Sequence, residues 1–328
     1  MKLKELGEVG LIQRLYEFQG EGLKAGIGED CAVFPMGEWD LLVSTDLMVE
    51  GVHFLKDLTP PEALGYKVLA VNLSDLASCG ALPLFYVVGL VSNPEEDWEY
   101  VERVYRGLYE LSRLYNVGLA GGDLSRGERM MISLTIIGKA QKDSWIPRSG
   151  AKVGERLFVS GTLGGSALGL MELKKGFKES PFIKRHLYPP IRLELGHLLA
   201  KGKLASAMID VSDGFLQDLE RLIDASRVGA EIEVGALPLE EGFIKRCEEM
   251  GVDPLELALS GGEDYELLFT VEEEKREEVL KLGERLRIKL TEVGRTIPQG
   301  LRLLKDGRPL EIPRKMGYDH FRWGSPST

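Results

Sequence analysis

A carboxylate falls on the apolar side of a predicted helix in Val71-Asn72-Leu73-Ser74-Asp75-Leu76-Ala77-Ser78-Cys79-Gly80. Counted at helical spacing from Leu64, the apolar stripe continues through Val68 and Val71, and its next member is Asp75. A carboxylate that faces a protein interior is costly unless a cation or several hydrogen-bond donors compensate its charge. For one Asp on its own, bonds from backbone amides are the simpler explanation. Other parts of the sequence are therefore needed to tell whether Asp75 is purely structural or belongs to a cation-binding site.

Length and charge narrow the classes of protein. The chain has 328 residues, enough for two domains with their own cores. Its 52 acidic and 41 basic residues give a net charge of -11, which argues against a nucleic-acid partner because phosphate backbones attract basic surfaces. An acidic protein that handles anionic substrates needs metal ions to reverse the local field.

The cysteine pattern and the N-terminal residues indicate where in the cell the protein is located. The three cysteines are far apart and form no C-x-x-C pair, which fits a reducing compartment and gives no zinc motif. The N-terminal residues carry charges where a signal peptide has its apolar core. We therefore expect a cytoplasmic protein.

The uncharged segment 76–94 is nearly long enough to cross a bilayer. It contains Gly80, Pro83 and Asn93-Pro94, which predict a helix end, a turn and a buried strand from Leu84 to Val91. We predict no membrane span.

Oxygen-bearing side chains gather on the predicted strand Leu41–Val49. Strand geometry sends Ser44 and Asp46 to one face and Thr45 to the other. Asp is uncommon inside strands, so Asp46 is a candidate for function. His53 follows shortly afterwards; a lone His is more often structural than functional, and its neighbours alone draw attention to it.

Glycine turns carry further carboxylates. Gly26–Phe34 is a glycine turn that leads Asp30 into a strand, although a lone G-x-G is weak evidence for phosphate binding. The apolar strand Val117–Asp123 ends in two glycines and Asp123, which lets a ligand approach the backbone closely. Gly161–Ser166 lies between a strand and a helix, where anions bind, but it lacks the Lys of a Walker A loop. A plain turn is the favoured explanation there.

A domain boundary is expected near the middle of the chain. Before it, Glu95–Tyr115 has the apolar periodicity of a helix, and core packing is the favoured explanation for Tyr105. Arg148–Glu155 follows a proline, is rich in small residues and precedes a new predicted strand. The sequence thus predicts an N-terminal domain at 1–140 and a C-terminal domain at 148–328.

A second acidic turn, Asp210–Gly214, lies between a predicted strand and a predicted helix. Ser212 or Asp213 would suit a helix N-cap, but two aspartates and a serine within four residues exceed what capping requires. Later, Ser260–Phe269 joins a glycine turn and two acids to a strand, and Tyr318–Trp323 is an aromatic tail that would pack on the core or close over a ligand.

Six aspartates lie at strand ends, glycine turns or an inward helix face: Asp30, Asp46, Asp75, Asp123, Asp210 and Asp213. Hard oxygen ligands without His or Cys partners indicate magnesium, and several carboxylates indicate more than one ion. Such acids beside glycine turns and an arginine favour phosphoryl transfer or a nucleotide site.

Seven motifs occur in order along nearly the whole chain: Gly28-Glu29-Asp30, Ser44-Thr45-Asp46, Asn72-Leu73-Ser74-Asp75, Gly121-Gly122-Asp123, Arg148-Ser149-Gly150, Asp210-Val211-Ser212-Asp213-Gly214 and Ser260-Gly261-Gly262-Glu263-Asp264-Tyr265-Glu266-Leu267. Together they closely resemble the thiamine-monophosphate kinase family, in the superfamily of aminoimidazole ribonucleotide synthetase and selenophosphate synthetase. The resemblance implies an α/β (α+β) two-domain synthetase-like fold, whose N-terminal sheet forms a barrel across a homodimer.

The resemblance also implies the ligands, thiamine monophosphate and ATP, with several Mg²⁺ ions. The implied metal residues are Asp30, Ser44, Thr45, Asp46, Asp75, Asp123, Asp210 and Asp213. The implied nucleotide contacts are Tyr105, Gly122, Asp123, Arg148 and Ser212. The implied contacts to thiamine monophosphate are His53, Glu263 and Trp323, with Phe321 as the competitor for the last.

The sequence can also be compared with alternative functions. A selenophosphate synthetase would carry a reactive Cys in an N-terminal glycine loop, and none precedes Cys31. A hydrogenase-maturation relative would end in Cys, whereas this chain ends in Ser-Thr. An amidine-cyclising ligase is the remaining enzymatic alternative, and a non-catalytic metal- or nucleotide-binding protein is the alternative from another class.

Overall fold

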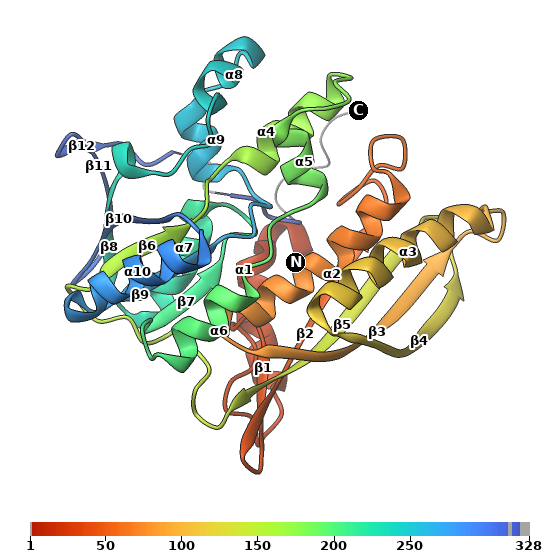
Figure 1. Cartoon of the computed structure of the whole chain (residues 1–328), viewed down its shortest axis with the longest axis horizontal. Helices are drawn as coiled ribbons and strands as arrows, with labels where there is room; N and C mark the ends of the chain where they lie inside the picture. Colours follow the sequence, from red (N-terminus) through yellow and green to blue (C-terminus); the bar gives the residue numbers. More distant parts are fainter. Residues whose placement is uncertain (1, 314–316, 322–328) are drawn as a thin grey trace.

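Two β-sheets organise the computed structural model, which describes residues 2–313 and 317–321 (Figure 1). The N-terminal sheet has five strands in the order β1-β2-β5-β3-β4. The C-terminal sheet has seven, in the order β12-β11-β8-β10-β6-β9-β7. The predicted mixed α/β fold class is confirmed.

The N-terminal sheet carries helices α2 and α3 across one face (Figure 1). Its elements are β1 (Ala32–Met36), β2 (Trp39–Val49), α2 (Pro61–Ser78), β3 (Leu82–Ser92), α3 (Trp98–Tyr115), β4 (Gly118–Arg126) and β5 (Met131–Gln141). The two helices touch through glycines: a Cβ on Gly65 would lie 1.9 Å from the carbonyl oxygen of Val104. This contact fixes α2 over the sheet, and with it the face that carries Asp75.

One predicted helix starts later in the structure than expected. Before the N-terminal sheet, the chain forms α1 (Leu3–Leu15), kinked at Gly7, and a short 3₁₀ turn (Tyr16–Phe18). The helix expected from Glu95 begins at Trp98, because the side chain of Asp97 accepts a hydrogen bond from Glu99 N at 3.1 Å and caps the helix there.

The C-terminal sheet alternates with shorter helices. Its strands are β6 (Arg156–Ser160), β7 (Ala207–Asp210), β8 (Gly229–Glu233), β9 (Leu267–Val271), β10 (Leu290–Ile297), β11 (Leu301–Lys305) and β12 (Arg308–Leu310). Its helices are α4 (Gly165–Lys174), α5 (Pro181–Leu187), α6 (Leu193–Lys201), α7 (Phe215–Ser226), α8 (Phe243–Met250), α9 (Pro254–Ser260) and α10 (Arg276–Leu286). Within the described parts of the chain, no helix combines the length and apolarity needed to cross a bilayer.

Helix α2 joins the two sheets through a shared core. It packs on β2 and β5 on one side and on α6 and β7 on the other. Buried residues of one cluster therefore come from both halves, for example Leu73, Leu134 and Met208. This arrangement brings the carboxyl end of β7 to the polar residues of α2.

The N-terminal sheet leaves its other face open. Leu47 on β2 and Phe85 on β3 are 45% and 43% exposed on that side. All nine residues of β4 are exposed, and only one edge of β4 is paired among the described strands. An exposed apolar face beside a free strand edge is typical of a surface that another chain covers.

Candidate active site

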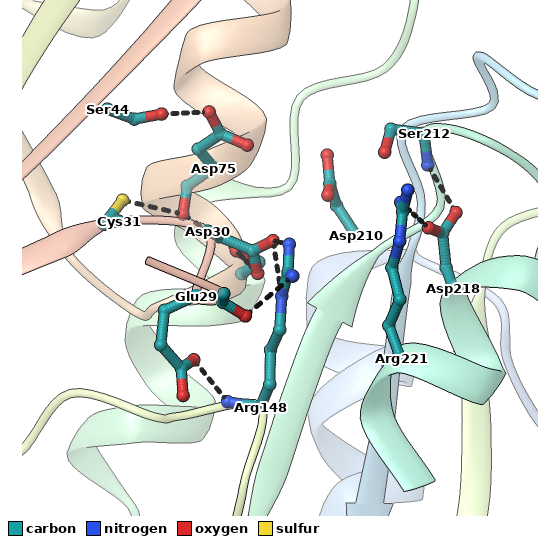
Figure 2. A network of polar contacts seen from close by, with 12 residues as sticks. Glu29, Asp30, Cys31, Ser44, Asp75, Arg148, Asp210, Ser212, Asp218 and Arg221 are labelled. Carbon is teal, nitrogen blue, oxygen red and sulfur yellow. Dashed lines mark hydrogen bonds and ion pairs between the residues drawn. The ribbon is translucent and has the colours of Figure 1, made fainter. Parts of the chain in front are cut away.

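Three carboxylates from distant parts of the chain meet where α2 passes between the sheets (Figure 2). Asp30 comes from the loop before β1, Asp75 from α2 and Asp210 from the end of β7. One oxygen of each lies within 4.8 Å of the others. The structure thus unites three of the predicted metal ligands, and we call them the carboxylate cluster.

Helix α2 supplies the hydroxyl groups that orient this cluster. Ser74 Oγ donates to Asp210 Oδ2 at 2.5 Å, and Ser78 Oγ donates to Asp30 Oδ2 at 2.6 Å. Both serines lie one turn or less from Asp75, so a single helix face places all three groups.

Burial and mutual repulsion make it unfavourable for the carboxylates of this cluster to be ionised together. Burial, followed by the charges of Asp46, Asp210 and Asp30, raises the pKa of Asp75 well above its ordinary value. Burial and the charge of Asp30 likewise raise the pKa of Asp210. Burial and the charges of Asp30 and Asp213 raise the pKa of Asp46 to about 6.

The donor set fits a hard divalent cation. Its atoms are carboxylate and hydroxyl oxygens, which Mg²⁺ prefers over nitrogen and sulfur. Cys31 lies close by, but its thiol is directed to the carbonyl oxygen of Asp75 at 3.5 Å. A bound cation would also remove the repulsion that raises the pKa of these carboxyls.

Arg148, in the connection between β5 and β6, borders the cluster (Figure 2). Its guanidinium donates to Asp30 Oδ1 through Nε at 3.0 Å and also through Nη2, and Nη1 donates to the carbonyl of Gly28 at 2.9 Å. The carboxylate of Glu29 accepts from Arg148 N at 2.8 Å. The motif around Asp30 therefore holds the arginine that the sequence predicted near the nucleotide.

Strand β2 divides its oxygen ligands between two faces, as predicted. Ser44 Oγ donates a short hydrogen bond to Asp75 Oδ2, and Asp46 shares that face. Thr45 lies on the open face, where it donates to the carbonyl of Leu134 and accepts from Thr135. In the protomer, Ser44 and Asp46 therefore adjoin the carboxylate cluster and Thr45 does not.

Asp123 also lies away from the cluster. The register Leu47↔Ser133, Ser133↔Gly89 and Gly89↔Asp123 puts Asp123 on the open face, three strands from β2 or about 14 Å. Beside it, a Cβ on Gly122 would lie 1.9 Å from the carbonyl of Val88, so only glycine fits there. One protomer does not bring Asp123 to the other carboxylates.

The loop between β7 and α7 holds Ser212 and Asp213. Oδ2 of the buried Asp218 accepts from the backbone N–H groups of Ser212, Asp213 and Gly214 at 3.0–3.1 Å (Figure 2). Arg221 Nη1 lies 2.6 Å from Asp213 Oδ2. Asp213 is thus paired with an arginine, and its charge also acts on Asp46 of β2.

His53 and Glu263, the two described residues predicted to contact the acceptor, belong to one polar region. Burial, then the neighbouring His320, lowers the pKa of His53 to about 4, although Glu263 opposes the shift. His53 Nδ1 accepts from Val49 N at 3.0 Å, so the ring proton lies on Nε2 and can be donated. The carboxylate of Glu263 lies 2.8 Å from Lys67 Nζ.

The C-terminal tail reaches the same region. Tyr318 N donates to the carbonyl of Asp213 at 3.1 Å, and the ring of His320 lies 5.1 Å from that of His53. The backbone of Phe321 is held by the side chain of Asp319 at 2.8 Å. Trp323 lies outside the described residues.

Tyr105 borders an open cavity of about 630 Å³ between α3 and β4. Tyr86, Arg113 and Leu119 are among the other lining residues. The cavity lies at the β4 edge of the N-terminal sheet. Tyr105 packs partly against the core, as the sequence predicted, and also faces this cavity.

Sequence reasoning missed Asp218 and Arg221. A signal was present, since Asp218 lies on the same helical face as the buried Phe215, Leu219 and Leu222. It also missed the partner of the turn 161–166, where Gly164 N and Ser166 N donate to Asp264. The favoured explanation of a plain turn is consistent with this contact, because the protein's own carboxylate fills the helix end.

Comparison with known proteins assigns this arrangement to a family. Residues 28–140 match the AIR synthase related protein, N-terminal domain, and residues 152–304 match its C-terminal domain. The thiamine-monophosphate kinase of Aquifex aeolicus is 38% identical, covering 98% of this chain and 100% of that protein. The Escherichia coli (strain K12) thiamine-monophosphate kinase is 39% identical, covering 96% and 98%.

A comparison with solved structures gives the same family as the sequence comparison. A solved structure of AaThiL complexed with AMPPCP and TMP has a TM-score of 0.85 and 36% identity, covering 98% of this chain and 99% of that one. With relatives above 30% identity matched over nearly their full length, the chain belongs to the thiamine-monophosphate kinase family, among the proteins built from the two AIR synthase related domains.

Proposed function

We propose that this protein transfers the γ-phosphoryl group of ATP to thiamine monophosphate, giving ADP and thiamine diphosphate. The observation that carries the proposal is the carboxylate cluster beside Arg148, in a chain of this family. The raised pKa of Asp75 and of Asp210 indicates a site that is incomplete without cations.

The chemistry needs no general base. The nucleophile is a phosphate oxygen that is already largely anionic near neutral pH, since a phosphomonoester has a second pKa of about 6. The barrier is the repulsion between two anions brought into line. Mg²⁺ ions held by the cluster, Ser44, Asp46 and Asp213 would neutralise charge on the transferring phosphoryl group. Arg148, bordering the cluster, would stabilise the same charge with fixed N–H donors.

Two groups are assigned to the acceptor. His53 Nε2–H donates to the phosphate of thiamine monophosphate, and Glu263 accepts from its aminopyrimidine. An aromatic residue of the tail, Trp323 in our assignment, stacks on the flat cationic ring. Support for the first two comes from the fixed tautomer of His53 and from the partial exposure of Glu263, 27%.

The remaining residues are assigned to the nucleotide and to a second copy of the chain. Thr45 and Asp123 lie on the open face, and Tyr105 and Gly122 lie toward the free edge at β4. We propose that a homodimer covers this face by closing the two N-terminal sheets into a barrel, which would complete the metal and nucleotide contacts. Ser212 contacts the nucleotide from the other side.

Domain roles and cellular location are also part of the proposal. Residues 1–140 form a metal- and ATP-binding domain that dimerises, and residues 148–328 form a C-terminal domain whose turn and tail contact the substrate, while single residues of each domain contribute to the other's ligands. A cytoplasmic location is supported by three buried cysteines that are all free thiols.

The test is a product assay with ATP, magnesium and thiamine monophosphate, separated by chromatography. Equal amounts of ADP and thiamine diphosphate, abolished by EDTA, are expected. ADP with inorganic phosphate and no thiamine diphosphate would instead favour the amidine-cyclising ligase. Unchanged ATP would favour a binding protein.

A further inference from the structure

Lys67 is a buried lysine on the helix that carries Asp75. It is 2% exposed and lies in the middle of α2 among apolar residues. Burying an ammonium group costs several kcal/mol in the absence of a partner. Its counter-charge is Glu263, whose Oε1 lies 2.8 Å from Lys67 Nζ.

The position of Lys67 relates it to the chemistry. It precedes Asp75 by eight residues, so both occupy one face of α2, about 12 Å apart along the axis. The helix thus carries a member of the carboxylate cluster near its C-terminal end and the ion pair near its middle. A substrate with a phosphate at one end and a polar ring at the other suits this spacing.

Both the backbone and the side chain of Glu263 are fixed by contacts with neighbouring residues. Its backbone has φ +67, a left-handed conformation that is strained for a residue with a side chain, and its N–H donates to the carbonyl of Ser212 at 2.7 Å. Oε2 lies 3.4 Å from Nδ1 of the buried His186. Burial, then Lys67, lowers the pKa of His186 to about 3, so this ring is neutral and Lys67 supplies the positive charge.

The balance of these effects keeps Glu263 ionised. Burial alone would raise the pKa of Glu263, but the nearby ammonium group of Lys67 lowers it overall. The pair is asymmetric in exposure: the side chain of Lys67 is 3% exposed and that of Glu263 is 27%. The carboxylate of Glu263 is therefore the more accessible member of the pair, and the ammonium group of Lys67 is buried behind it.

We propose that Lys67 is a positioning residue of the acceptor site, which holds Glu263 as an oriented carboxylate able to accept an N–H from an amino-substituted heterocycle. The proposal rests on the proposed function and extends it, since it explains how that site recognises an amino group. Lys67 acts through Glu263 and does not contact the substrate.

The test compares Lys67→Met and Lys67→Arg with the wild type, and with Lys281→Met on the exposed face of α10 as a control. In Lys67→Met we expect kcat/KM for thiamine monophosphate to fall about 10- to 100-fold, with KM for ATP within about twofold. Lys67→Arg should recover part of the loss, and Lys281→Met should match the wild type. An equal change in both KM values, or no change in either, would overturn the proposal.

A substrate analogue separates positioning from a general structural role. The probe is thiamine monophosphate without the amino group on its pyrimidine ring. Wild type should prefer the natural substrate over the probe by about 10-fold or more, and Lys67→Met should lose most of this preference. Because the ratio is measured within each enzyme, a uniform loss of folded protein does not change it. A preserved preference in Lys67→Met would contradict the proposal.

The double variant Lys67→Met/Glu263→Gln guards against misfolding, because it removes both charges of the pair together. If Lys67 acts through Glu263, the double variant should use thiamine monophosphate no worse than Glu263→Gln alone. A further additive loss would show a separate role for Lys67. Absence of thiamine diphosphate with the wild type would refute the proposed function itself, which is a distinguishable result.

Discussion

Replacing Asp46 by Asn should stabilise the metal-free protein and also abolish its activity. Burial and the charges of Asp30 and Asp213 raise the pKa of Asp46 from 3.8 to about 6. At roughly 1.4 kcal/mol per pKa unit, ionised Asp46 costs the folded state at most ~3 kcal/mol, and roughly 1–2 kcal/mol once solvent screening is allowed for. The Asn variant avoids this cost.

The pH dependence has a defined sign. Because folding raises the pKa of Asp46, the destabilisation is absent below pH 3.8, grows as the pH rises to about 6, and is constant above that. In EDTA at pH 7.5, Asp46→Asn should therefore melt roughly 1–3 °C above wild type, and the difference should shrink toward pH 4.5. Saturating Mg²⁺ should stabilise the wild type more than the variant.

The assay is thermal unfolding followed by circular dichroism, with kinase activity measured on the same samples. The exposed Asp57→Asn is the charge-matched control and should change neither property. An Asp46→Asn protein that melts at or below wild type in EDTA at pH 7.5 would refute the repulsion argument. A variant that keeps activity within about threefold would refute the ligand assignment.

Four further outcomes follow from the contacts. Arg148→Met should lower kcat at least about 100-fold in a folded protein, since fixed donors to a transferring phosphoryl group are lost; circular dichroism and steady-state kinetics check it. Asp218→Ala should cost roughly 2–4 kcal/mol in urea unfolding, because three backbone N–H groups and an arginine lose their acceptor. Phe85→Asp, on the open face of the N-terminal sheet, should give monomers by light scattering and lose activity with them; dimers would oppose the proposed barrel. Asp75→Ala should reduce turnover far more than Trp323→Ala, and equal mild losses would count against the metal assignment.

The order of elements was predictable from the sequence because local patterns determine it. The strand predicted at Leu84–Val91 lies within β3. Asp75 was identified because an apolar stripe at helical spacing contained a carboxylate. The same argument applied to Asp218 or Lys67 would have found them, since each interrupts the inward face of its helix.

The partners of these groups could not be predicted in the same way. Asp30 meets Arg148, and Lys67 meets Glu263, across separations of more than a hundred residues that no local pattern specifies. The strand alternation that put Thr45 opposite Asp46 was confirmed, but the register that places Asp123 on the same open face depends on three strand pairings. The order of the motifs identifies the candidate site residues, whereas their contact partners depend on tertiary packing.

If the carboxylate cluster supports direct phosphoryl transfer to thiamine monophosphate, the γ-phosphoryl group must pass from ATP into the product. Wild type and Asp75→Asn would each be mixed with ATP labelled in its γ-phosphate, Mg²⁺ and thiamine monophosphate in a single turnover. The label should enter thiamine diphosphate with wild type and stay in ATP with the variant. Label in inorganic phosphate, or equal transfer by both proteins, would contradict it.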